Sequence, residues 1–288
     1  MMNDKQRATN YELRATSDER RVTDEKIHHS PFAIRHFPYL ILALAMGLAI
    51  FLRFYKLGEV PPALNGDEAV FGSGALQILQ EGPVLSVEGQ GGAGVLASYI
   101  AAFFFALSEP GKMALRFQTS FFGVLTVLLL FLATRALFLN VGRVANLSYK
   151  DLPVLNMEQT QANWLGAIAA LLLAVSYSHA TISRISFAIV HLPFLELLSV
   201  WLFWTAYRSG KRWHFILAGA SLALAMYGYV AGFVMPGLFF GFVLVNWAIE
   251  TRRQGDKERG RQGEGGTRTR SGFFTRQGEV PNYDTSAS

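Results

Sequence analysis

Seven long apolar stretches, separated by more polar segments, dominate the middle of this 288-residue chain. They cover residues 38–54, 93–107, 117–138, 164–182, 187–206, 214–229 and 230–249. A helix needs about 20 mostly apolar residues, with a range of about 17–25, to cross the hydrocarbon core of a bilayer. Helices are also one of the few structures that satisfy all their backbone hydrogen bonds there. The pattern therefore predicts an all-α polytopic membrane protein.

The composition excludes several other classes of protein. Charged residues make up 16% of the chain, against about 25% in an average soluble domain, so a single soluble core is not expected. The sequence pI is about 9.5, but no basic stripe lies on an apolar-cored fold, so we expect no nucleic-acid partner. The chain has no cysteine, which excludes a disulfide scaffold and thiolate chemistry.

The two ends of the chain differ from its middle. Residues 1–37 form a polar, charge-rich leader, which we expect in the cytoplasm. Arg53 to Lys56 stand at the end of the apolar stretch 38–54, where a cleaved signal peptide would have a small-residue cleavage site, and this favours a retained signal anchor. Residues 251–288 are rich in Gly, Arg, Gln and Thr without apolar periodicity, so the sequence predicts a disordered cytoplasmic tail.

The distribution of positive charge predicts the orientation in the membrane. Cytoplasmic segments carry an excess of Lys and Arg. If stretch 93–107 does not cross the membrane, most of the 26 Lys and Arg residues lie on the cytoplasmic side. If it does cross, more of them lie outside than inside. We therefore predict six spans within 38–250, both termini in the cytoplasm, a long outer loop at 55–116 and residues 93–107 along the outer surface. The location expected is the cell (plasma or inner) membrane.

An adjacent acidic pair, Asp67 and Glu68, follows Pro61-Pro62 and Gly66 in the predicted outer loop. The pair precedes an expected helix at 68–80, which has an interfacial amphipathic pattern. In one interpretation Asp67 lies near the N-cap and only caps free backbone N–H groups. In the other, a carboxylate at the membrane surface acts as a general base or a metal ligand.

Several other polar residues fall at the predicted membrane surface. Arg116 and Arg184 lie on the predicted outer side against the charge bias, so each either binds an anion such as a lipid phosphate or snorkels to the interface. His179 lies in a predicted span, where ionisable groups are candidates for function and also for packing. Tyr227 and Tyr229 are typical of an aromatic belt.

A set of motifs in order along residues 38–249 resembles one enzyme family. The motifs are Leu52-Arg53-Phe54-Tyr55-Lys56-Leu57-Gly58, Pro61-Pro62, Gly66-Asp67-Glu68-Ala69, Ala114-Leu115-Arg116, Ala133-Thr134-Arg135-Ala136-Leu137-Phe138, Ser183-Arg184-Ile185-Ser186-Phe187 and Leu224-Ala225-Met226-Tyr227-Gly228-Tyr229. Together they resemble the start of family 39-type membrane glycosyltransferases, which are relatives of protein O-mannosyltransferases and aminoarabinose transferases with the GT-C fold.

The resemblance implies a hexosyltransferase that uses a polyprenyl-phosphate sugar at the outer membrane face. It implies Asp67 as catalytic base with Glu68 beside it, and Arg116 and Arg184 at the donor phosphate. His179, Tyr227 and Tyr229 are candidate substrate contacts. Two juxtamembrane helices of the family match 68–80 and 93–107. The acceptor is not indicated, and no cofactor is implied beyond a divalent metal for which the sequence shows no ligand set.

Three departures from the family pattern keep other functions open. Residues 92–96 carry no carboxylate where many relatives have one, no arginine closely follows Tyr229, and relatives are longer with more spans. The chain could therefore be an N-terminal fragment, and a non-catalytic remnant or partner subunit is the main alternative. A lipid or solute transporter is less favoured, because intramembrane charges are few and no inverted repeat is visible.

Overall fold

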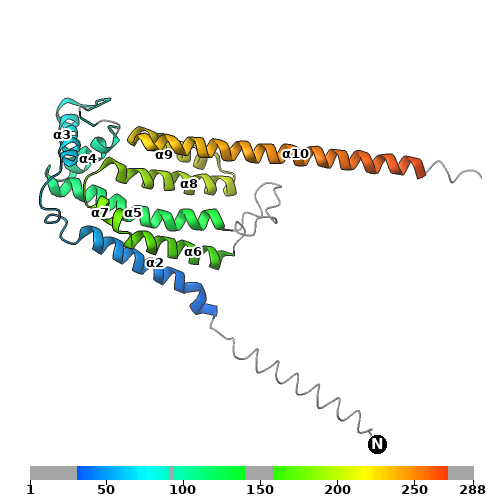
Figure 1. The fold of residues 1–288 in the computed structure, drawn as a ribbon, viewed down its shortest axis with the longest axis horizontal. Coiled ribbons are helices and arrows are strands. Elements are labelled where there is room, and N and C mark those ends of the chain that lie inside the picture. Colours follow the sequence, from blue (N-terminus) through cyan, green and yellow to red (C-terminus); the bar gives the residue numbers. More distant parts are fainter. Residues whose placement is uncertain (1–30, 88, 91–93, 140–157, 272–288) are drawn as a thin grey trace, which may run out of the picture. The chain divides into compact units, whose positions relative to one another are not determined.

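The computed structural model describes residues 31–87, 89–90, 94–139 and 158–271, and these residues form helices and connecting loops without a strand (Figure 1). The chain divides into two compact units, residues 1–233 and 234–288. The first unit holds α2 (Pro31–Phe54), α3 (Gly66–Glu81), α4 (Leu96–Leu107), α5 (Lys112–Phe138), α6 (Gln159–Val175), α7 (Tyr177–Ser183), η3 (Ala188–Val190), α8 (His191–Ser209), α9 (Arg212–Gly228) and η4 (Val230–Phe233). The second unit begins with α10 (Val234–Ser271).

Four helical segments among the described residues are long and apolar enough to cross a membrane. They are His36–Phe54, Lys112–Phe138, Ala188–Ser209 and Val230–Ile249. The segment predicted as one span at 164–182 is instead two helices, α6 and α7, bent by 62°, and it makes a fifth span if the pair counts as one. The structure therefore confirms a helical membrane protein, and four or five of its segments are long and apolar enough to be candidate spans, where six were predicted. The remaining predicted span, 214–229, corresponds to α9, whose 17 residues are at the lower end of the length needed for a crossing.

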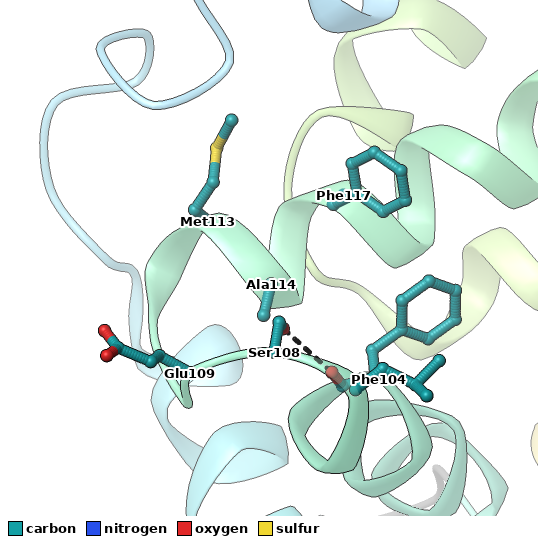
Figure 2. A pocket seen from close by; sticks show the side chains of 7 residues that line it. Phe104, Ser108, Glu109, Met113, Ala114 and Phe117 are labelled. Carbon is teal, nitrogen blue, oxygen red and sulfur yellow. Dashed lines mark hydrogen bonds between the residues drawn. The ribbon is translucent and has the colours of Figure 1, made fainter.

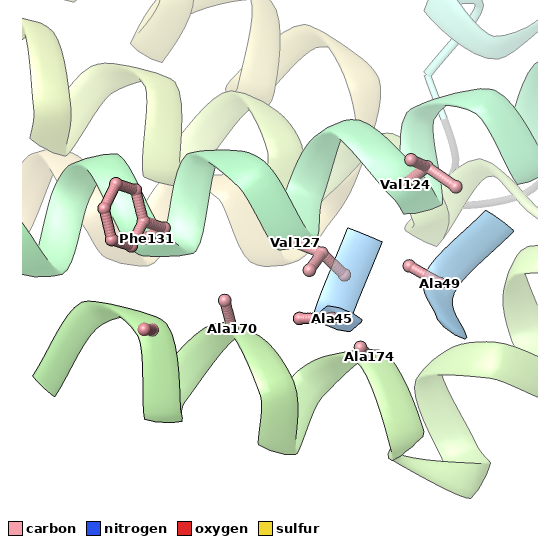
Figure 3. Close-up of a cluster of buried hydrophobic side chains, with 8 residues drawn as sticks. Ala45, Ala49, Val124, Val127, Phe131, Ala170 and Ala174 are labelled. Atoms are coloured by element: carbon pink, nitrogen blue, oxygen red, sulfur yellow. The ribbon is translucent and has the colours of Figure 1, made fainter. Parts of the chain in front are cut away.

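Small side chains hold the bundle together where α2, α5 and α6 pack on one another (Figure 3). The buried cluster there consists of Ala45, Ala49, Val124, Val127, Phe131, Ala167, Ala170 and Ala174. In lipid the hydrophobic effect contributes little to helix association, so helices associate through close van der Waals packing between small residues. This accounts for alanine on the facing sides of α2 and α6.

The loop between α2 and α5 folds into a cap made of α3 and α4. These helices coincide with the two predicted at 68–80 and 93–107, and they pack against the first turn of α5 through Ala75, Phe105 and Leu115. The backbone N–H of Gly94 donates to the carbonyl of Gly228 at 3.1 Å, which ties the cap to the end of α9. A Cβ on Gly94 would lie 1.6 Å from the carbonyl oxygen of Tyr227, so glycine is required at this contact.

The C-terminal segment differs from its prediction. Residues 251–271, expected to be disordered, continue α10 as far as Ser271. Adding a residue to an existing helix costs far less than starting one, and no proline occurs between Gly237 and Ser271. Residues 272–288 of the predicted tail and 1–30 of the predicted leader lie outside the described residues, while 31–37 belong to α2.

Candidate functional site

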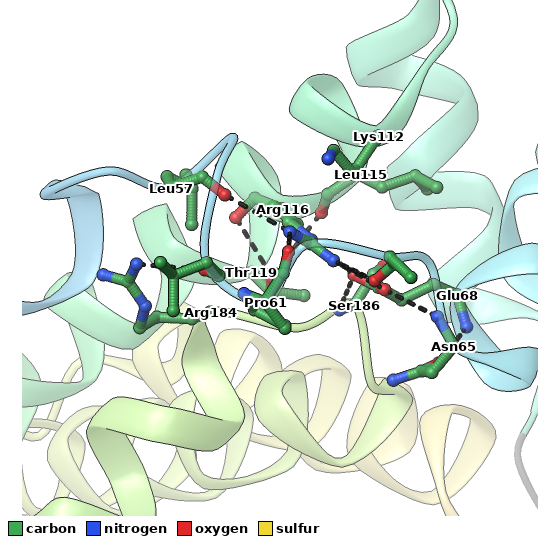
Figure 4. A network of polar contacts seen from close by, with 12 residues as sticks. Leu57, Pro61, Asn65, Glu68, Lys112, Leu115, Arg116, Thr119, Arg184 and Ser186 are labelled. Atoms are coloured by element: carbon green, nitrogen blue, oxygen red, sulfur yellow. Dashed lines mark hydrogen bonds and ion pairs between the residues drawn. The ribbon is translucent and has the colours of Figure 1, made fainter.

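A buried ion pair between Glu68 of α3 and Arg116 of α5 lies at the centre of the cap (Figure 4). The Nε of Arg116 donates to Oε1 of Glu68 at 2.8 Å, and Nη2 donates to Oε2 at 3.1 Å. Both side chains are fully buried. A two-point pair of this kind is a strong, directional contact, and it fixes the start of α3 against the second turn of α5.

Glu68 also takes part in the N-terminal cap of α3. The side chain of Asn65 accepts from the backbone N–H of Glu68 at 2.8 Å, and Oε2 of Glu68 accepts from the backbone N–H of Asn65 at 3.0 Å. This reciprocal arrangement is a capping box. Asn65, and not Asp67, is therefore the capping residue: Asp67, expected near the N-cap, lies two residues after it and is exposed in the first turn of the helix.

The surroundings of Glu68 keep it ionised. Burial alone raises the pKa of its carboxyl group, but hydrogen bonds from Arg116, Asn65 and the backbone N–H of Ser186 outweigh that effect. The net result is a pKa below the usual value for glutamate. The Ser186 contact, at 3.2 Å, joins the segment after α7 to the same carboxylate. Three parts of the chain that are distant in sequence thus meet at one side chain.

The remaining donors of Arg116 bind backbone carbonyls of the loop after α2. Nη1 donates to Leu57 at 3.4 Å and to Pro61 at 2.5 Å, and Nη2 donates to Ala63 at 2.8 Å. With the two bonds to Glu68, these contacts use all five N–H groups of the guanidinium. The geometry therefore gives Arg116 a role in organising the loop and leaves it no donor for a phosphate.

Arg184 performs a similar task at the end of α2. Its Nη1 donates to the carbonyl of Leu52 at 2.8 Å, and its Nη2 donates to that of Val60 at 3.0 Å. Longer contacts reach the carbonyls of Arg53 and Lys56, both at 3.4 Å. The last carbonyls of a helix have no partner within the helix, and a cation there is favourable. Burial, and then the charge of Arg116, lower the pKa of the half-buried Arg184.

A third arginine, Arg53, was not among the predicted site residues and is fully buried in α2. Its guanidinium donates to the carbonyl of Ala174 at 3.2 Å, beside the break between α6 and α7, and lies 2.6 Å from Nδ1 of His179. The break leaves Ala174 without its usual partner along the helix, and Arg53 supplies one. An ionisable residue inside an apolar stretch was the signal that could have identified it.

The other candidate residues lie apart from the ion pair or serve packing. His179 belongs to α7, and its side chain contacts Arg53. Tyr229 packs partly buried against Phe71 and Ala97 of the cap, while Tyr227, at the end of α9, is partly exposed. The structure thus brings Glu68, Arg116 and the loop held by Arg184 into one network, with Asp67 exposed on the neighbouring position.

Two findings bear on what the site could bind. Within the described residues, no group of three or more His, Asp or Glu side chains is placed to hold a metal ion. Comparison with protein-family models, with curated proteins and with solved structures finds no match to this chain. The geometry around Asp67 and the motifs in the sequence are therefore the observations that bear on function.

Proposed function

We propose that the chain is a membrane glycosyltransferase, or the N-terminal part of one, that transfers a sugar from a polyprenyl phosphate to an acceptor hydroxyl. The observation that supports this most directly is that the two residues of the acidic pair differ in burial and in contacts. Glu68 is buried and occupied by Arg116, Asn65 and Ser186, whereas its neighbour Asp67 is exposed on a helix start that this network holds rigidly. A fixed, accessible carboxylate suits a general base.

In the proposed reaction, Asp67 takes the proton of the acceptor hydroxyl. The acceptor oxygen forms a bond to the anomeric carbon of the sugar, and the bond from that carbon to the phosphate oxygen breaks. Polyprenyl phosphate leaves with the electron pair. The proposal assigns no phosphate contact to Arg116, because its five donors are used. Arg184 is the remaining candidate of the two, through its Nε–H, because its Nη groups contact four backbone carbonyls.

The proposal includes the finer membrane topology. It places the cap and Asp67 at the outer face and both termini in the cytoplasm. Six crossings require that α6 with α7, and the 17-residue α9, each cross once. Support for this comes from the bias of Lys and Arg along the sequence.

The test is sugar transfer by the 288-residue chain in proteoliposomes. The probes are radiolabelled polyprenyl-phosphate mannose and glucose, and the readout is release of free polyprenyl phosphate. We expect Asp67→Asn to lower the rate by about 10²–10⁴-fold, as removal of a general base does. Glu59→Gln is the matched control, because Glu59 is an exposed carboxylate of the same loop. Equal rates for Asp67→Asn and the unmodified chain would overturn the proposed role.

A second candidate is a non-catalytic partner subunit or remnant of such an enzyme. The observation that favours it is that Arg116, expected at the donor phosphate, is fully used by Glu68 and three carbonyls. This candidate predicts that the unmodified chain binds polyprenyl phosphate without releasing it from a sugar donor. Turnover by the purified chain would exclude it.

A further inference from the structure

A pocket of about 380 Å³ lies where the end of α4 meets the start of α5 (Figure 2). The side chains of Phe104, Leu107, Met113, Ala114 and Phe117 form its apolar walls. Ser108 and Glu109 complete its lining at the turn between the helices. The site is separate from the Glu68 network, since none of these side chains contacts that ion pair in the hydrogen bonds of the described residues.

The interior of the pocket offers a ligand no strong polar contact. The hydroxyl of Ser108 already donates to the carbonyl of Phe104 at 2.8 Å. Figure 2 shows the carboxyl group of Glu109 directed away from the rings of Phe104 and Phe117. An apolar, flexible ligand therefore fits the walls better than a sugar or a nucleotide, each of which would lose hydrogen bonds to water.

The pocket continues into a face of α5 that is exposed along a candidate membrane span. Met113, Phe117 and Phe121 are 54%, 42% and 40% exposed and follow one another at intervals of four residues. Residues at that spacing lie above one another on a helix. The ring of Phe104 lies 6.0 Å from that of Phe117 and 6.2 Å from that of Phe121, so α4 forms the second wall of the same groove.

We propose that this pocket binds one acyl chain of a bilayer phospholipid. The continuity of the pocket with the exposed aromatic stripe of a span indicates its occupant, because hydrocarbon chains of the bilayer surround such a stripe. The exposed carboxylate of Glu109 at the mouth disfavours an anionic headgroup, so the lipid is zwitterionic, such as phosphatidylethanolamine. The bound chain wedges α4 against α5 and so supports the cap. This inference is independent of sugar transfer.

The experiment uses the full chain in liposomes that contain phosphatidylethanolamine with a diazirine on one acyl chain. After irradiation, peptide mass spectrometry locates the cross-links. We expect them to concentrate in residues 104–117, well above those at Leu172, an apolar side chain that is 65% exposed on α6. Equal labelling at the two places would show only general contact with lipid and would overturn the proposal.

Two variants test the pocket itself, with a matched control. Ala114→Leu fills the pocket, and Leu107→Asn makes an exposed part of its wall polar without altering the core. Both variants are expected to lose the cross-links in 104–117. Ala106→Leu, which lies on α4 beside Leu107 but outside the pocket lining, is expected to retain them. If Ala114→Leu does not fold, Leu107→Asn decides. Retained labelling in Leu107→Asn would contradict the proposal.

A competition arm separates the two sources of a hydrocarbon chain. Unlabelled polyprenyl phosphate is added to the same liposomes before irradiation. We expect labelling of residues 104–117 to be unchanged. Displacement of the label by polyprenyl phosphate, but not by an equal amount of unlabelled phosphatidylethanolamine, would assign the pocket to a polyprenyl lipid and overturn the phospholipid assignment.

Discussion

The first unit of the chain is held together by different forces in two regions. Between α2, α5 and α6, alanines such as Ala45 and Ala170 pack at zero exposure, and the side chains that meet there are apolar. Where the chain leaves its helices, in the loop after α2 that leads to the cap and at the break between α6 and α7, three arginines donate mainly to backbone carbonyls. They are Arg53, Arg116 and Arg184. The first region depends on shape and the second on hydrogen bonds.

The difference follows from what each region needs. Regular helices satisfy their own backbone groups, so the contact between them needs only close packing. A loop or a broken helix leaves carbonyls without donors, and a buried unpaired polar group costs about 1–3 kcal/mol. An arginine offers five donors in one plane, so one side chain can satisfy several such carbonyls. Arginine at the end of a span is therefore as much a structural device as a candidate ligand.

The largest predicted effect comes from removing Arg116. Arg116→Ala leaves the Glu68 carboxylate buried without its cation and should cost about 3–5 kcal/mol of unfolding free energy. Detergent-induced unfolding in bicelles measures this loss. Lys112→Ala, one turn earlier on α5, removes a single exposed hydrogen bond to the carbonyl of Pro62 and should change stability by less than about 0.5 kcal/mol. Similar losses for the two variants would contradict the comparison.

The packed region should respond to volume rather than to charge. Ala170→Leu places extra atoms in the fully buried seam of α6 and should cost about 1–3 kcal/mol. The same unfolding measurement applies, with Leu172→Ala as control, because Leu172 lies on the exposed side of the same helix. If leucine at position 170 were tolerated as well as alanine at 172, the seam would not be close-packed.

The sequence predicted the helices better than the polar contacts that join them. Apolar stretches and the pattern around Asp67 and Glu68 were enough to place α2, α3, α4 and α5. The contacts of Arg53 and Arg116 were not predictable, because their partners are backbone carbonyls brought near by tertiary packing and carry no sequence signature. The capping box could have been predicted from the sequence, since Asn65 and Glu68 stand three residues apart at the start of a helix.

The break between α6 and α7 shows a second limit of the sequence. The apolar stretch 164–182 contains no proline or glycine near Ser176 that would predict a bend. The donor that stabilises the break, Arg53, belongs to another helix. A helix can therefore be broken by a neighbour, which a reading of local sequence does not detect.

Acid should weaken the cap and leave the packed region unaffected. Because the folded-state pKa of Glu68 lies below its unfolded value, near 4.5, its contribution is complete above that value and is lost as the pH falls through the folded pKa. We expect the stability difference between the unmodified chain and Glu68→Gln to shrink as the pH falls from 7 to below 4.5. Thermal melting across this range measures it. The penalty of Ala170→Leu should stay constant, and a constant Glu68→Gln penalty would refute the assignment.

The smallest effect concerns the start of α3. Asn65→Ala removes the side chain that accepts from the backbone N–H of Glu68, and loss of such a cap costs about 0.5–2 kcal/mol. Hydrogen exchange at the Glu68 amide should accelerate, while exchange within the packed seam around Ala170 should not change. Asn65→Ser keeps a side-chain acceptor and should restore protection. Faster exchange at both places would mean that cap and bundle unfold as one unit, and the two regions would then not be energetically distinct.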